Sequence, residues 1–116
     1  MSGVELESIP SAQQYVVAFR AVADDLADSY LEMLRVHYHA PHRTVTATQL
    51  SRAVRYQNYN SANLHYGKMG GLVGRQLGWR PKMPLKVLVS FEKPGNEWHW
   101  IMRPQVFHAL EELGWT

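Results

Sequence analysis

The chain contains no cysteine and no long apolar run, and each absence excludes a class of protein. Without cysteine it has no disulfide framework, no thiolate zinc site and no cysteine nucleophile. No apolar stretch approaches the roughly 20 residues of a membrane-spanning helix. The first residues, Met1 to Glu5, lack the basic-then-apolar layout of a signal peptide. We therefore expect a soluble, unprocessed, cytoplasmic protein without a membrane partner.

Recognisable catalytic patterns are missing as well. No serine, histidine and acid trio and no carboxylate pair has a spacing that indicates hydrolysis. His37, His39 and His42 form an H-x-H-x-x-H run, but the first two point to different sides of a helix and Pro41 interrupts the third. Metal ligation is thus the weaker interpretation of these histidines. We predict no enzyme activity, no cofactor and no bound metal.

What the chain does have is enough material for one core. Its 116 residues include 46% hydrophobic and 11% aromatic residues, which suits a single domain over residues 1–116. We see no internal repeat and no linker long enough to divide it.

Charge is distributed unevenly along this domain. Residues 1–39 carry two basic and six acidic side chains, residues 40–103 carry ten basic and two acidic ones, and the tail adds two glutamates. Clustered Lys and Arg bind phosphates through counterion release, so the middle of the chain favours a polyanion such as nucleic acid. A solvated basic face is the alternative interpretation.

Apolar periodicity predicts one long helix at the N-terminal end. Side chains from Tyr15 to His37 recur at steps of three and four over residues 11–40. Pro41 ends this pattern. A break near Ala23 to Asp25 is compatible with the sequence.

Residues 46–78 are typical of a helix-turn-helix. Thr46 and Gln49 form a capping box for a helix over about 47–55. A polar turn follows, then Asn60 or Ser61 can cap a third helix over 60–77, which Gly78 ends.

The remaining residues predict a β-hairpin and a last helix. Residues 85–92 alternate as a strand, and residues 97–101 form an aromatic strand that can pair back within a hairpin over 85–102. Pro104 and Gly114 bound a short helix over 104–114. This order predicts an α+β fold, winged-helix-turn-helix-like: a long N-terminal helix, two further helices, a hairpin wing and a short C-terminal helix.

In that fold, the third helix would enter the major groove of duplex DNA. Asn60, Asn63 and Arg75 are the best candidates for reading bases, whereas Arg52, Arg55, Lys82 and Lys93 suit phosphate contacts. Helix capping, or tyrosines that pack in the core, would explain part of the pattern equally well. The full candidate DNA-binding set is Arg52, Arg55, Asn58, Tyr59, Asn60, Ser61, Asn63, His65, Lys68, Arg75, Lys82 and Lys93.

Glycines and tryptophans are the other conspicuous residues. Gly67, Gly70, Gly71 and Gly74 lie on one helical stripe, which indicates close approach to another helix, with a phosphate-cradling loop as the alternative. Trp98 and Trp100 share a strand face, where core packing is the ordinary interpretation and base stacking the other.

The segments Thr46 to Val54 and Tyr59 to Gly70 resemble small domains attached to HNH-type restriction endonucleases, which also occur as short stand-alone proteins of bacteria and phages. The resemblance lies within residues 46–78. It implies DNA recognition in a restriction, defence or phage counter-defence setting, with cleavage left to a separate HNH domain. The chain has no cysteine pairs and no His-Asn-His ensemble, so nuclease activity is not carried over.

Duplex DNA is therefore the expected partner. The alternative is a protein-binding module, such as a phage-encoded inhibitor of a host defence complex, similar in role to an anti-CRISPR protein. Such a module would use its acidic first helix or its basic face against a protein. The sequence gives no basis for predicting an oligomeric state.

Overall fold

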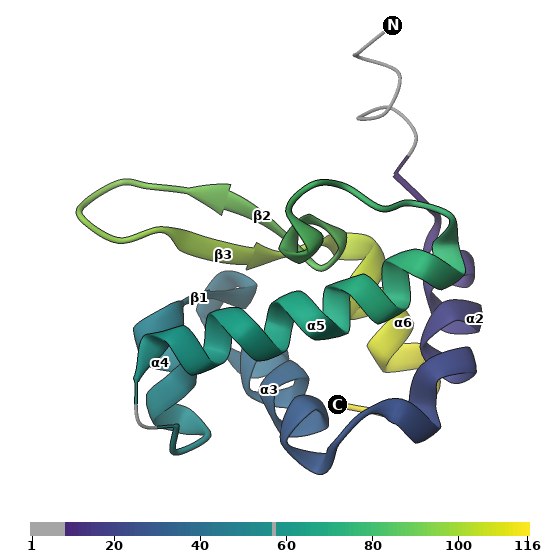
Figure 1. The fold of residues 1–116 in the computed structure, drawn as a ribbon, viewed down its shortest axis with the longest axis horizontal. Helices are drawn as coiled ribbons and strands as arrows, with labels where there is room; N and C mark the ends of the chain where they lie inside the picture. Colours follow the sequence, from purple (N-terminus) through teal and green to yellow (C-terminus); the bar gives the residue numbers. More distant parts are fainter. Residues whose placement is uncertain (1–8, 57) are drawn as a thin grey trace, which may run out of the picture.

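A computed structural model describes residues 9–56 and 58–116. For Tyr59 it describes the backbone but not the side chain. The expectation about a signal peptide concerns Met1 to Glu5, outside the described residues. The described chain is α+β, with α-helices that pack mainly against one another and a three-stranded antiparallel sheet at one side of them (Figure 1). In that part of the chain, no helix is both long and apolar enough to cross a membrane.

The predicted long N-terminal helix is two helices, α2 (Ala12–Val22) and α3 (Asp28–His39). A 3-10 turn over Ala23–Asp25 and extended residues after it separate them. Aspartate competes with helical hydrogen bonding through its side chain, and three aspartates lie between Ala23 and Ser29. Leu26 is still buried, so the apolar periodicity runs through the break without revealing it.

The middle of the chain adds a strand that the sequence did not predict. Thr44–Thr46 forms β1, between a 3-10 turn over Pro41–Arg43 and the helix α4 (Ala47–Ala53). The capping box of α4 is confirmed, because Thr46 Oγ1 accepts from the Gln49 amide and Gln49 Oε1 accepts from the Thr46 amide. Thr46 therefore ends the strand and caps the helix.

The hairpin is shorter than predicted. Residues Pro84–Val87 form a 3-10 turn rather than strand, and only Val89–Glu92 (β2) and His99–Met102 (β3) pair. Val87, Leu88 and Val89 are all buried, so the alternation of a half-exposed strand does not hold there. The sheet order is β1-β3-β2, with Phe91 opposite Trp100 and Val45 also opposite Trp100.

The two last helices end at the predicted glycines. The helix α5 spans Tyr59–Leu77 and stops at Gly78, and α6 spans Pro104–Leu113 and stops at Gly114. Both glycines have the positive φ that favours glycine. Figure 1 shows α5 crossing the front of the molecule, with α3 behind it and the β2–β3 hairpin projecting above the α5 end that lies near α4.

Candidate nucleic-acid interface

One side of α5 is open to solvent and carries the three predicted base-reading residues, together with Lys68 and the exposed Leu64. Asn60, Asn63, Lys68 and Arg75 are all exposed, at spacings that place them on one helical face. The opposite side, with Ala62, Tyr66, Met69 and Val73, is buried in the core. The whole helix contains no acidic residue. This polar and basic surface of Asn60, Asn63, Lys68 and Arg75 is called the α5 face below.

The glycines of α5 divide between its two sides. A Cβ on Gly70 would lie 2.2 Å from the carbonyl oxygen of Pro84, and one on Gly74 would lie 2.5 Å from the carbonyl oxygen of Trp79. The close approach is therefore made at these two positions, against the segment that leads from α5 to β2. The expectation of close packing is wrong for Gly71, where a Cβ would meet nothing within 4 Å. Gly71 instead leaves a bare patch of backbone between Lys68 and Arg75.

A hollow beside this bare patch collects cationic side chains. Its volume is about 510 Å³, and Lys68, Gly71 and Arg75 of α5 line it together with Arg80. Asp25 and Tyr30 close its other side. Arg80 was not among the predicted site residues, because it lies in a proline-rich connector with no helical periodicity to place it.

Other predicted residues near the start of α5 have structural partners. The Asn58 side chain caps the helix by accepting from the Asn60 amide at 2.9 Å, so the expectation that Asn60 or Ser61 is the cap is wrong. His65 lies beside Tyr30 and Tyr56, with ring centroids 5.4 and 5.1 Å apart. This contact places His65 outside the α5 face. Ser61 is half-buried, and the prediction for the Tyr59 side chain lies outside what the structure describes.

The predicted phosphate-binding cations are exposed on neighbouring elements. Arg52 is on α4, and Arg55 lies in the turn before α5 with a positive φ of 64°. Lys82 is in the connector after α5, and Lys93 is in the hairpin turn with its Nζ 5.4 Å from the centroid of the Trp98 ring. All four side chains are available to a ligand, and none is buried.

Between the hairpin and the starts of α4 and α5 lies a second, larger cavity of about 690 Å³. Trp100 is almost fully buried, but Trp98 is 52% exposed and Met83 is 49% exposed. The prediction that both tryptophans pack in the core is therefore confirmed for Trp100 and wrong for Trp98. The sequence reasoning also missed Lys86, which lines this cavity with Asn63. The W-x-W pattern after a basic turn was the sequence signal available for this cavity.

Below the cavity, a buried histidine joins three elements. His37 of α3 accepts a hydrogen bond from the Tyr66 hydroxyl at Nδ1 (2.8 Å) and donates one from Nε2 to the Trp100 carbonyl (2.9 Å). Both partners fit the neutral ring, and burial lowers the pKa of His37 to about 4. Burial likewise raises the pKa of Tyr66. His37 is thus a core residue that fixes the floor beneath Trp100.

The described residues contain no group of three or more His, Asp or Glu side chains placed to hold a metal ion. His37 is turned into the core, whereas His39 and His42 are exposed. The three histidine side chains of the H-x-H-x-x-H run therefore do not converge on one point.

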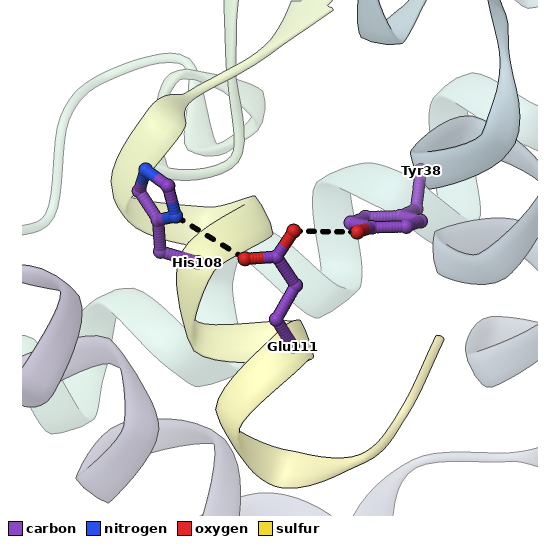
Figure 2. Close-up of polar contacts among 3 residues, drawn as sticks. All are labelled: Tyr38, His108 and Glu111. Atoms are coloured by element: carbon purple, nitrogen blue, oxygen red, sulfur yellow. Dashed lines mark hydrogen bonds and ion pairs between the residues drawn. The ribbon is translucent and has the colours of Figure 1, made fainter.

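A separate polar cluster joins α6 to α3 (Figure 2). Glu111 accepts a hydrogen bond from the Tyr38 hydroxyl at 2.5 Å and pairs with His108 Nδ1 at 3.3 Å. The bond to Glu111 raises the pKa of Tyr38, and the same bond lowers the pKa of Glu111. The guanidinium of Arg43 packs between the rings of Tyr38 and Phe107, 4.3 and 4.9 Å from their centroids. These contacts clamp α6 to α3.

Comparisons of the chain with models of known protein families, with curated proteins and with solved structures found no match.

Proposed function

We propose that this chain is a small duplex DNA-binding module of winged-helix type. The helix pair α4 and α5, followed by the β2–β3 hairpin, supports this proposal, because the order resembles a helix-turn-helix with a hairpin wing. In this proposal α5 is the recognition helix and the β2–β3 hairpin is the wing. The helices α2 and α6 pack together near the end of α5 that lies away from α4 (Figure 1).

The observation that carries the proposal is the α5 face. A recognition helix must enter the major groove with side chains that can hydrogen-bond to base edges, and it must not repel phosphates. Asparagine and arginine are suited to the first requirement, since they make paired bonds to adenine and guanine. The absence of acidic residues from α5 meets the second. Gly71 adds a place where the DNA can approach the helix backbone closely.

Roles follow from position within this arrangement. Asn60, Asn63 and Arg75 would read bases, because they lie on the exposed helix. Arg52, Arg55, Lys82 and Lys93 would contact phosphates on either side, because they lie on the elements that flank α5. The resemblance of residues 46–78 to HNH-associated domains favours a restriction, defence or phage counter-defence setting.

A protein-binding module, such as an inhibitor of a host defence complex, is the second candidate. Exposed apolar side chains support it, since Leu64 of α5 is 55% exposed, and Trp98 and Met83, which both line the larger cavity, are exposed as well. Protein binding through apolar contacts would change little with salt, whereas DNA binding through phosphates weakens steeply.

A double substitution tests the assignment of phosphate contacts. We expect Arg52→Ala with Arg55→Ala to weaken binding about equally on all duplex sequences, because phosphate contacts carry no sequence information. The slope of log affinity against log salt should fall by about 2 in magnitude, near one for each lost contact. Fluorescence anisotropy with labelled duplexes at several salt concentrations gives both values.

The matched control is Arg20→Ala with Arg35→Ala, which removes two exposed arginines from α2 and α3. This control should leave the salt slope unchanged. A changed sequence preference with an unaltered slope in the Arg52/Arg55 variant would contradict the assignment.

A further inference from the structure

The larger cavity has a built aromatic wall on the side of the hairpin. Phe91 and Trp100 are directly opposite each other on β2 and β3, so they share one face of the sheet. Trp98 lies two residues before Trp100 and meets the Phe91 ring edge-on, with centroids 6.1 Å apart. Trp100 is fixed from below by stacking on Tyr66, at 5.6 Å and an interplanar angle of 21°. Trp100 is almost fully buried and Trp98 is half exposed, so the cavity offers a planar ligand mainly the surface of Trp98.

Polar groups around this wall can hydrogen-bond to the edge of such a ligand. Thr48 of α4 donates a hydrogen bond to Glu97 Oε2 at 2.6 Å, which fixes the carboxylate at the cavity. Asn63 of α5 and Asn96 of the hairpin turn also line it. Amides supply both donors and acceptors, and the carboxylate supplies acceptors, as the Watson–Crick edge of a nucleobase requires.

Charge decides between a nucleobase and a cationic peptide side chain, which aromatic cages also bind. Lys86 lines the cavity, and Lys93 stands above the exposed Trp98 ring. The Glu97 carboxylate offsets one of these two ammonium groups, so the net charge around the cavity is still positive. It opposes a cationic guest and favours the phosphates on either side of a nucleotide. The volume of about 690 Å³ lies within the range of ligand pockets, and the site adjoins Asn63 on the α5 face.

We infer that the cavity between the hairpin and α5 holds a single unstacked DNA base, turned out of the duplex or left unpaired. A stacked base has both faces covered and cannot enter, so the base must leave the helix before it reaches Trp98. This inference rests on the proposed DNA-binding function. It adds that the module distinguishes duplexes by how easily one base can be displaced.

The test compares two labelled duplexes of the same length and sequence context, one fully paired and one with a single central mismatch. Displacing a mismatched base costs less than displacing a paired one. We therefore expect the parent protein to bind the mismatched duplex about tenfold more tightly, as measured by fluorescence anisotropy at fixed salt. Trp98→Ala should reduce this ratio to about one, because it removes the stacking surface.

Two further variants control the experiment. Trp98→Phe keeps an aromatic face and should keep most of the preference. Val17→Ala truncates another exposed apolar side chain, which is 59% exposed on α2 and lies outside the cavity. This variant should keep the full preference for the mismatched duplex. Circular dichroism verifies that each variant is folded.

Three results would overturn the inference. If the parent bound both duplexes with equal affinity, the base pocket would be ruled out, but DNA binding would not. Equal weakening of both duplexes by Trp98→Ala would make Trp98 a general DNA contact. If the parent bound neither duplex, both the inference and the proposed function would be ruled out.

Discussion

Replacing Gly70 with alanine is expected to lower the free energy of unfolding by about 3 kcal/mol. The added methyl group would lie 2.2 Å from the Pro84 carbonyl oxygen, a backbone atom that can move only if the 3-10 turn over Pro84–Val87 moves away from α5. This loss outweighs the gain of about 1 kcal/mol that alanine brings to a helix. Thermal unfolding followed by circular dichroism should show a drop in Tm of roughly 10 °C.

Gly71→Ala is the matched control, one residue away on the same helix. Its added Cβ would meet nothing within 4 Å, so only the gain in helix propensity remains. We expect the Tm of this variant to stay the same or to rise. If both variants had equal Tm values, α5 would not pack against Pro84 as described.

A second large effect is expected from pH. Burial holds the pKa of His37 at about 4 in the folded protein, while an unfolded histidine titrates near 6.5. The unfolded chain therefore binds more protons below pH 6.5, so stability is complete above that pH and is lost as pH falls toward 4. The loss should reach about 2 kcal/mol between pH 7 and pH 5, at about 1.4 kcal/mol per unit below pH 6.5.

Urea unfolding at pH 7, 6 and 5 measures this loss, in a range where most carboxylates stay ionised. His37→Gln should lower stability at pH 7, because it disturbs the bonds to Tyr66 and Trp100, but the pH dependence in this range should largely disappear. His39→Gln alters an exposed histidine and should keep the parent's dependence. If the His37→Gln variant kept the full pH dependence of stability, another titratable group would be its source.

Elements bounded by local signals could be predicted from the sequence. The capping box at Thr46 and the glycines at 78 and 114 act through neighbouring residues, so their patterns identify helix ends without knowledge of the fold. The predicted α+β class is confirmed. The winged-helix assignment stays a proposal.

Features that depend on distant partners were missed. The strand β1 has three residues, and its partner β3 lies more than fifty positions along the chain. Residues 85–87 are predicted as strand because apolar residues alternate there, but they belong to a 3-10 turn over Pro84–Val87 that packs closely against Gly70 and Gly74 of α5. The cavity beside Trp98 is built from four separate segments, and no sequence window contains it.

The salt dependence of binding to duplex DNA is the most direct test of the proposed function. Purified protein is titrated against a labelled duplex of random sequence at about 50 and 200 mM salt, and the affinity at each salt is compared. A module that contacts about six phosphates should lose affinity on the order of a thousandfold between these conditions. Absence of binding at the lower salt, or an affinity that stays constant across the range, would contradict DNA recognition and favour a protein partner.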